Sequence, residues 1–293
     1  MKVTFHVGLP KTATTYLQKH VFPHEEAISF VHRRNNRAAD RFIRQVQEFV
    51  RRPSLDRDAL VRARAYLVDR AARARRQGKF SIVVSDENIT VMIGDFWNRK
   101  FLDPERLISR CGLLVDELAS DGLEVQYLCL IRRQDNWLAS RYAESAKRNE
   151  HFSQAGFERY INGKHFRRAV DESVLDYYHL HCQMSESIGS GRVMLLPFER
   201  YEDDPARVLQ EIAEFVGVDA LTEPGEPGSA VNRLRSESDV WRLKQSENSV
   251  DAERTLRLTP QLRQQILEAF ESSNAKLDEL WSGELSKYGY LGA

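Results

Sequence analysis

Apolar residues predominate in four short segments along the chain, and between these segments they recur at helical spacing. The segments cover residues 3–8, 80–84, 125–131 and 193–196, a length typical of buried strands. Strands that alternate with helices favour an α/β fold, with a central, mainly parallel sheet flanked by helices on both faces. The intervening patterns predict helices at 12–22, 39–50, 55–77, 103–120, 132–149, 173–188, 205–216 and 259–281.

The chain of 293 residues is long enough for one large α/β domain or for two smaller domains. We expect a single domain over residues 1–293, with a helical, Arg-rich insert at about 33–78 and a C-terminal helical segment at about 236–283. Residues 222–238 contain Pro224, Gly225, Pro227 and Gly228 and predict a long loop, a type of segment that is often functional.

The residues between the first strand and the first helix carry the strongest chemical signal, and they are Gly8–Thr15 (GLPKTATT). At such a turn backbone N–H groups converge, and the helix dipole favours an anion. Lys11 adds a cation, and the hydroxyls of Thr12, Thr14 and Thr15 add donors. The segment therefore predicts a phosphate-binding loop, although threonines in a first helical turn also serve as plain helix caps.

This loop differs from the pattern of P-loop kinases and NTPases, which is G-x-x-x-x-G-K-[ST]. Gly8 and Lys11 are only three residues apart, and Lys11 precedes the threonines instead of following a second glycine. Such enzymes also need ligands for Mg²⁺, and the sequence shows no clear set of them. A P-loop kinase or NTPase therefore stays as an alternative interpretation.

A second motif follows the third predicted strand. Arg132 comes directly after that strand, and Ser140 and Tyr142 follow eight and ten residues later. An arginine offers a planar pair of donors to a phosphate, and ligands of open parallel sheets bind at the carboxyl ends of the strands. An arginine followed by a serine, taken alone, indicates only a solvated surface.

Together, the two motifs resemble those of the PAPS-dependent sulfotransferases, in particular the bacterial and carbohydrate-type members of the P-loop sulfotransferase superfamily. The first family pattern is Pro-Lys-[Ser/Thr]-Gly-Thr-Thr, and here residues 10–15 match it with Ala13 in place of the glycine. Alanine is tolerated there if its φ is negative. The second family pattern is R-x-P-x-x-x-x-x-S-x-Y, in which Gln134 replaces the proline, so the turn is expected to differ locally.

The resemblance implies a P-loop NTPase-like sulfotransferase fold and transfer of the sulfuryl group from PAPS, with release of PAP. The acceptor would be a hydroxyl or amine of a carbohydrate, a glycolipid or a small molecule. No metal is required, because positioning and charge stabilisation supply the catalysis, and Lys11 would neutralise charge on the leaving phosphate. The residues implied to bind the co-substrate are Pro10, Lys11, Thr12, Ala13, Thr14, Thr15, Arg132, Ser140 and Arg233.

The family commonly closes over the nucleotide with a basic residue of a C-terminal loop. Arg233 and Arg235 in the 222–238 segment are both candidates for that role. An ordinary solvated loop is an equally good interpretation of this segment.

Glu87 is the candidate general base for the acceptor, because it follows the second predicted strand and would lie at the same sheet edge as Lys11. Ser85-Asp86-Glu87 resembles the Ser-Ser-Glu of bacterial sulfotransferases. Asp86 is the rival base, and both acids also fit a plain role at a strand end. His6 lies inside the first strand and is expected to be a hydrogen-bonded core residue. The reserve candidates for the base are His20, His24 and His151.

Charge is balanced over the whole chain and unbalanced within it. The 43 basic and 43 acidic residues exclude a whole-chain polybasic nucleic-acid binder. Residues 33–76 hold 14 Arg against 5 acidic residues, and residues 199–293 hold 11 basic against 19 acidic residues. The basic region predicts either attraction of an anionic acceptor, such as a sulfated glycan, or pairing with the acidic C-terminal half.

The remaining features place the protein in a reducing compartment. Three cysteines without metal-ligand spacing predict buried thiols, and the chain has no apolar stretch of membrane-spanning length and no secretory signal pattern at its N-terminus. We therefore expect a cytoplasmic enzyme without a transmembrane segment. A non-catalytic relative that binds a nucleotide or glycan stays as a further alternative, and the oligomeric state stays open.

Overall fold

The computed structural model describes residues 1–89, 104–146, 152–222, 239–243 and 255–292. These residues form two compact units. The first unit comprises the described residues up to Ile131 and those from Leu180 to Thr222. The second unit comprises the described residues of Arg132–His179 and those from Asp239 onward. The prediction of one domain over the whole chain stays a prediction.

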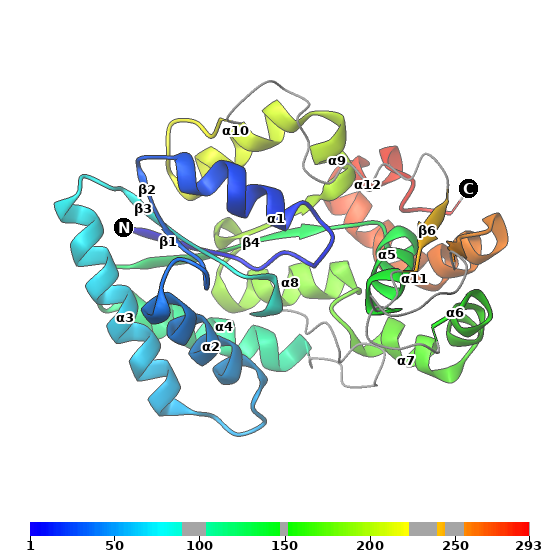
Figure 1. Ribbon diagram of the computed structural model, residues 1–293, viewed down its shortest axis with the longest axis horizontal. Helices are drawn as coiled ribbons and strands as arrows, with labels where there is room; N and C mark the ends of the chain where they lie inside the picture. Colours follow the sequence, from blue (N-terminus) through cyan, green and yellow to red (C-terminus); the bar gives the residue numbers. More distant parts are fainter. Residues whose placement is uncertain (90–103, 147–151, 223–238, 244–254, 293) are drawn as a thin grey trace, which may run out of the picture. The chain divides into compact units, whose positions relative to one another are not determined.

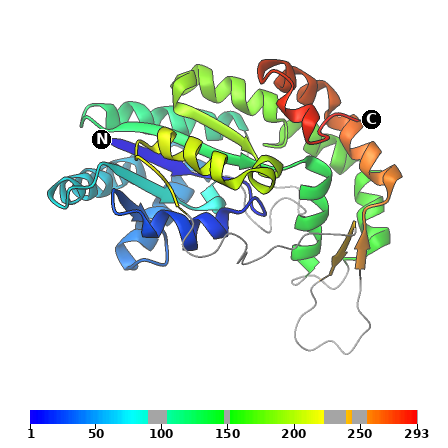
Figure 2. The ribbon, with the colours of Figure 1, turned by 90° about the horizontal axis from the view of Figure 1, so that it is seen from above.

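The first unit is built on a five-stranded parallel sheet of order β2-β3-β1-β4-β5. Because all the strands run in the same direction, their carboxyl ends share one edge of the sheet. Pairing continues beyond β1, since the N–H of Val7 donates to Leu128 O and the N–H of Leu9 donates to Leu130 O (2.9 and 3.1 Å). The start of the predicted phosphate loop is thereby held beside β4 (Figure 2). The strands are β1 (Lys2–His6), β2 (Ile28–Val31), β3 (Ser81–Ser85), β4 (Glu124–Ile131) and β5 (Val193–Pro197).

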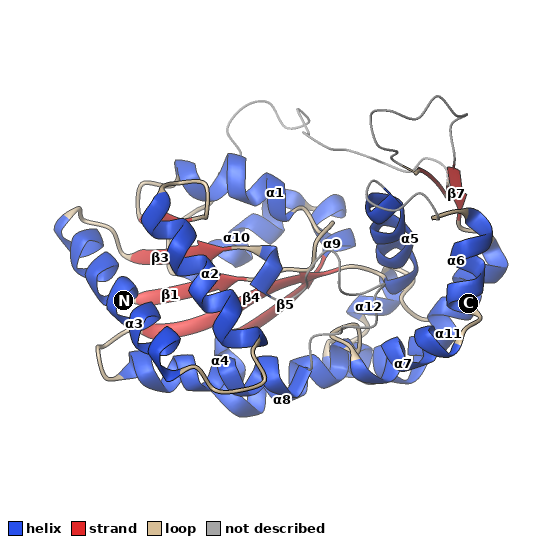
Figure 3. Ribbon diagram, turned by 60° about the horizontal axis from the view of Figure 1, so that its bottom comes forward, coloured by secondary structure: helices blue, strands red, loops and turns tan. Residues whose placement is uncertain are grey.

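Helices cover both faces of this sheet (Figure 1). One face carries α1 (Thr14–Tyr16) with its continuation, and α10 (Pro205–Val216), which follows the short helix α9 (Phe198–Asp203). The other face carries α4 (Pro104–Ala119) and α8 (Tyr177–Ile188), with α2 (Arg37–Arg51) and α3 (Arg57–Arg76) packed against each other (Figure 3). The core of the first face is a cluster of buried side chains that includes Leu17, Val21, Val83, Leu128, Leu130, Val208, Ile212 and Val216.

The predicted fold class is confirmed, and the four predicted strands correspond to β1, β3, β4 and β5. Strand β2 was not predicted, because its apolar run is four residues long and is interrupted by Ser29. Its position in the sheet matters, since Val31 pairs with Val84 at the end of β3. Strand β2, which the sequence pattern did not predict, therefore brings residues 32–36 to the same edge as the Asp86–Glu87 segment.

The helix predicted at 12–22 has an irregular form. Only Thr14–Tyr16 is α-helical, Leu17–Val21 is a π-helix (η1), and Phe22–His24 is a 3₁₀ turn (η2). Pro23 lies inside this last turn instead of following the helix, because a 3₁₀ turn accepts proline in its first positions. π-Helical turns are rare and recur at functional sites, so this departure marks the segment after the loop.

The second unit is mainly helical. Its helices α6 and α7 and the antiparallel pair β6–β7 were not predicted, and the pair lies in the segment from about 236 that was expected to be helical. Helix α11 starts only at Pro260, where Thr259 accepts the N–H of Leu262 as the N-terminal cap. The elements are α5 (Gln134–Ser145), α6 (Gln154–Ile161), α7 (Lys164–Glu172), β6 (Val240–Arg242), β7 (Thr255–Arg257), α11 (Pro260–Leu280) and α12 (Glu284–Lys287).

The prediction of buried thiols is confirmed for Cys111 and Cys129, whereas Cys182 is half-buried. None of the three forms a disulfide. Burial raises the pKa of Cys111 and of Cys129 to about 12, so both stay protonated at neutral pH. Within the described ranges, no helix is long and apolar enough to cross a membrane.

Asn36 caps helix α2, since its Oδ1 accepts the N–H of Ala39 at 2.9 Å. We expect Asn36→Ala to lower the free energy of unfolding by about 0.5–2 kcal/mol, because the N–H loses its partner. Asn36→Asp keeps an acceptor and is expected to retain the wild-type stability. Urea titrations of the three proteins measure both effects, and equal destabilisation by the two variants would contradict the capping role.

Candidate active site

The predicted phosphate loop is held in shape by its own threonines. The hydroxyl of Thr12 donates to Leu9 O at 2.5 Å and lies 3.3 Å from the hydroxyl of Thr14, which is 3.5 Å from the same carbonyl. Both threonines are buried, whereas Thr15 is exposed. The structure thus gives Thr12 and Thr14 a role inside the loop, and Thr15 presents its hydroxyl to solvent.

Gly8 allows the loop to pass close to strand β4. A Cβ atom at this position would lie 3.2 Å from the backbone nitrogen of Leu130 and 3.4 Å from the hydroxyls of Thr12 and Thr14. The backbone of a central strand cannot move away, so a side chain at Gly8 would displace the loop.

Two residues of the loop that are not glycine have a left-handed backbone conformation, Lys11 with φ of 75° and Ala13 with φ of 57°. The condition under which alanine was expected to be tolerated at position 13, a negative φ, is not met. Glycine, which the family pattern has at this position, adopts this region without a steric cost, whereas alanine brings its Cβ close to the backbone. The loop of this chain therefore has a backbone conformation that favours glycine at position 13. It has this conformation although the residue there is alanine.

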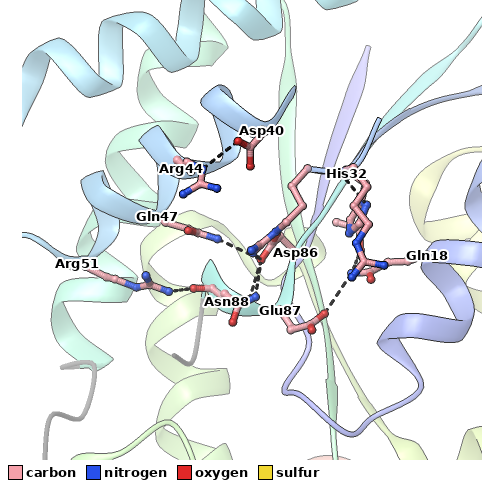
Figure 4. Close-up of polar contacts among 12 residues, drawn as sticks. Gln18, His32, Asp40, Arg44, Gln47, Arg51, Asp86, Glu87 and Asn88 are labelled. Carbon is pink, nitrogen blue, oxygen red and sulfur yellow. Dashed lines mark hydrogen bonds and ion pairs between the residues drawn. The ribbon is translucent and has the colours of Figure 1, made fainter. Parts of the chain in front are cut away.

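Asp86 is buried at the end of β3 and is surrounded by donors (Figure 4). Arg33 forms a two-pronged ion pair with it, with Nε to Oδ2 and Nη2 to Oδ1 both at 2.5 Å. Gln47 of α2 donates to Oδ1 at 3.2 Å, and the backbone N–H of Asn88 donates to the same oxygen at 2.9 Å. Since both oxygens are occupied, Asp86 connects the ends of β2 and β3 with α2 and is a structural acid.

Glu87 follows directly and makes different contacts. Its Oε2 accepts a hydrogen bond from Gln18 Nε2 at 3.3 Å, and Gln18 belongs to the π-helix that follows the phosphate loop. Burial raises the pKa of Glu87 above its ordinary value, and the neighbouring charge of Asp86 raises it further. The hydrogen bond from Gln18 and the positive charge of Arg33 both lower the pKa of Glu87. A carboxyl group with a raised pKa beside the predicted phosphate loop has the property that a general base requires.

His6 lies in the core, as predicted, but it is not fully hydrogen-bonded. Its Nδ1 is 2.7 Å from Ser85 Oγ, which also accepts a hydrogen bond from Gln18 Nε2 at 3.1 Å. Among the atoms that the structure describes, Nε2 of His6 has no hydrogen-bond partner. Burial lowers the pKa of His6 to about 3, so the ring is neutral at physiological pH.

The arginines of the 33–76 region form ion pairs within the first unit. Besides Arg33, Arg64 forms a two-pronged pair with Asp121 at 2.6 and 2.9 Å. Arg44, Arg52 and Arg73 each pair with an acid four residues away on their own helix or at its end. Such exposed pairs stabilise a protein little, and they balance part of this positive charge locally.

The second motif lies in the second unit. Arg132 directly follows β4, its carbonyl accepts the hydroxyl of Tyr177 at 2.7 Å, and Ser140 lies half-buried on α5. Gln134, which replaces the family's proline, forms a reciprocal amide pair with Asn274 of α11 (2.8 and 3.1 Å). The replacement thus has a structural reason, because a proline could not make these hydrogen bonds.

The other candidates have the following places. His20 lies half-buried in η1, with its ring 5.2 Å from that of Tyr16, and His24 is exposed in η2. Arg233, Arg235 and His151 lie outside the described residues. Within the described ranges, no group of three or more His, Cys, Asp or Glu side chains is arranged to hold a metal ion.

Sequence reasoning did not find Gln18, Arg33 and Gln47. Gln18 had a detectable signal, since it lies one turn beyond the phosphate loop on the predicted helix. Arg33 and Gln47 had none, because their contacts with Asp86 depend on strand β2, which the pattern did not predict.

Comparison with known proteins gives a fold relationship. The chain matches the crystal structure of a sulfotransferase from Alicyclobacillus acidocaldarius with a TM-score of 0.54 and 16% sequence identity, over 97% of each chain. The sulfotransferase domain of the olefin synthase from Synechococcus PCC 7002 matches with a TM-score of 0.34 and 15% identity, over 75% of this chain and 74% of that one. No family model and no curated protein matches the sequence. The first match shows that the chain has the sulfotransferase fold that its two motifs predicted.

The left-handed conformation of Ala13 leads to a stability test. We expect Ala13→Gly to raise the free energy of unfolding by about 0.5–1 kcal/mol, because the steric cost of the left-handed region is larger than the added flexibility of the unfolded chain. Ala63→Gly in the middle of helix α3 is the matched control and should lower it by about 1 kcal/mol. A loss of stability in both variants, measured by urea unfolding, would show that the loop is not strained.

Proposed function

We propose that this protein is a PAPS-dependent sulfotransferase, which transfers the sulfuryl group of PAPS to a hydroxyl or amine of a carbohydrate, a glycolipid or a small molecule. The observation that carries the proposal is the contact between Gln18 and Glu87. It joins the helix that follows the Lys11 loop to the acid that follows β3, within a chain that has a sulfotransferase fold. This contact supports an arrangement in which a cation, an anion-binding loop and a base share one sheet edge.

The loop residues divide the binding task. Gly8, Thr12 and Thr14 support a backbone conformation in which Pro10, Lys11, Ala13 and Thr15 face the 5′-phosphosulfate. Lys11 provides a cation for the charge that develops on the bridging oxygen as the sulfur–oxygen bond breaks. By resemblance, Arg132 and Ser140 bind the 3′-phosphate of PAPS, and Arg233 closes over the nucleotide.

Glu87 acts as the base in this proposal. Its carboxylate takes the proton of the acceptor hydroxyl while the acceptor oxygen forms a bond to sulfur and PAP leaves with the bonding electrons. The two-pronged contact of the Arg33 guanidinium with both oxygens of Asp86 favours Glu87 over Asp86 for this role. Positioning and charge stabilisation supply the rate enhancement, as in other in-line transfers.

Calorimetry with PAP in a buffer that contains EDTA tests the co-substrate. We expect binding of one PAP per chain, and we expect Lys11→Ala to weaken it at least tenfold, because the charge-assisted contact is lost. Lys19→Ala is the matched control, since Lys19 is exposed on the next turn, and it should bind PAP like the wild type. Absence of PAP binding, or turnover of ATP that requires Mg²⁺, would overturn the proposal and favour the kinase alternative.

Glu87→Gln tests the chemical step. We expect the transfer rate with labelled PAPS and a responding acceptor to fall by about 10²–10⁴, as is typical when a general base is removed. PAP affinity should stay within about twofold of the wild type, because the amide keeps the shape of the side chain. An unchanged transfer rate would remove Glu87 from the base role, and a wild-type protein that binds PAP without transferring sulfate would be a non-catalytic relative.

The raised pKa of Glu87 also predicts a change in stability with pH. The folded state favours the protonated form, so this contribution to stability is present below the ordinary pKa of Glu87 and is lost as the pH rises through its raised value. Glu87→Gln carries no charge to desolvate and should be more stable than the wild type at neutral pH. Urea unfolding at acidic and neutral pH measures the difference, and a difference that does not change with pH would contradict the shift.

The acceptor itself is the next question for this proposal. A screen of hydroxylated compounds with labelled PAPS, including sulfated and unsulfated versions of the same glycan, identifies its class. Dependence of KM on salt only for the anionic acceptors would support attraction by the 33–76 region. The cytoplasmic location stays a prediction.

A further inference from the structure

We infer that Gln18 is a positioning residue, which orients the Glu87 carboxylate from the helix of the phosphate loop and thereby couples the two halves of the catalytic apparatus. This inference rests on the proposed function and deepens it. It assigns to Gln18 neither contact with the acceptor nor contact with PAPS. Its role is exerted entirely through Glu87.

The geometry gives Gln18 two fixed partners. It lies on the π-helix η1, four residues after Thr14, and its side chain is buried. A primary amide has two N–H donors, and Nε2 of Gln18 lies 3.1 Å from Ser85 Oγ and 3.3 Å from Glu87 Oε2. Figure 4 shows this bridge from η1 to the segment after β3. One amide nitrogen therefore joins the loop helix to the last residue of β3 and to the segment after it.

The Glu87 carboxylate decides which end of the Gln18 amide faces it, and the Ser85 contact is compatible with that orientation. Ser85 Oγ lies 2.7 Å from Nδ1 of His6 at the end of β1, a strand that pairs with β3 through His6 and Ser85. If the amide turned around, its oxygen would face the Glu87 carboxylate, and the two acceptors would repel each other. The ionised carboxylate thus selects the orientation that the chain His6–Ser85–Gln18 supports.

The charged surroundings explain why this neutral donor matters. Asp86 disfavours the ionised form of Glu87, as burial does, and Arg33 favours it while being committed to Asp86. His32, which lies near Asp86, has a pKa that burial lowers, and buried His6 is neutral. Gln18 is therefore a donor that favours the ionised, basic form of Glu87 without bringing a charge of its own.

The position of Gln18 on η1 has a mechanistic consequence. The N–H groups of Tyr16 and Leu17 bond to Ala13 O at 2.8 and 3.1 Å, so the helix begins directly at the loop. A ligand that tightens the loop acts on the same helix that orients the base. The loop and the base are thus connected through one helix.

The test compares two glutamines that each donate to one of two neighbouring carboxylates. Gln18→Met removes the donor to Glu87 and nearly keeps the volume, and Gln47→Met does the same for Asp86. The readouts are the pH profile of kcat/KM with labelled PAPS, PAP affinity by calorimetry, and the titration of Glu87 followed by carbonyl NMR.

For Gln18→Met we expect the acidic limb of the profile to move to higher pH, with kcat about tenfold lower at the acidic end and PAP affinity within about twofold of the wild type. The NMR titration of Glu87 should move in the same direction. Gln47→Met should leave the limb in place. Ser85→Ala, which removes only the anchor of the amide, should shift the limb in the same direction by less, and it replaces Gln18→Met if that variant does not fold.

An acidic limb and a Glu87 titration that do not move in Gln18→Met or Ser85→Ala, while the wild type transfers sulfate, would overturn the positioning role and leave the proposed function standing. A wild-type protein that neither binds PAP nor transfers sulfate would overturn the proposed function, and the positioning role with it. Equal shifts in Gln18→Met and Gln47→Met would show a general effect of packing and would also overturn the inference.

Discussion

The ion pair between Arg33 and buried Asp86 organises the edge of the sheet at which the proposed chemistry takes place. A buried carboxylate without a partner is very costly, so the two-pronged contact with Arg33 and the donors from Gln47 and Asn88 are a condition for this segment to fold as it does. Together, the contacts of Asp86 with Arg33 and Gln47 connect the ends of β2 and β3 with α2. They also fix the turn after β3, and thereby the direction in which Glu87 leaves the strand.

Two adjacent acids obtain different properties from this arrangement. Asp86 is held by several donors, whereas Glu87 has fewer and has a raised pKa, since burial and the charge of Asp86 act together. This is a general way to obtain an acid and a base from chemically similar groups. The cost to stability that accompanies the ionised Glu87 is the type of conflict that is typical of functional sites.

The phosphate loop shows a second conflict between stability and site geometry. Lys11 and Ala13 both have a positive φ, and the loop is kept in that shape by contacts of Thr12 and Thr14 with Leu9 and by pairing with β4. Sequence reasoning located this loop correctly from its place between a strand and a helix. It did not foresee the positive φ of Ala13, because a residue type biases a backbone angle but tertiary contacts decide it. For the same reason the continuation of the loop helix as a π-helix was not visible in its regular apolar spacing.

The sequence by itself determined the fold class, four of the five strands of the sheet, and the positions of Lys11 and Glu87 after β1 and β3, because apolar periodicity and order along the chain are local properties. Only the tertiary structure decided that Asp86 is structural, that β2 brings Arg33 to this edge, and that Gln18 contacts Glu87. These contacts join side chains 53 and 69 residues apart in the chain. Their geometry follows from the parallel register of β1, β2 and β3, which no local pattern encodes.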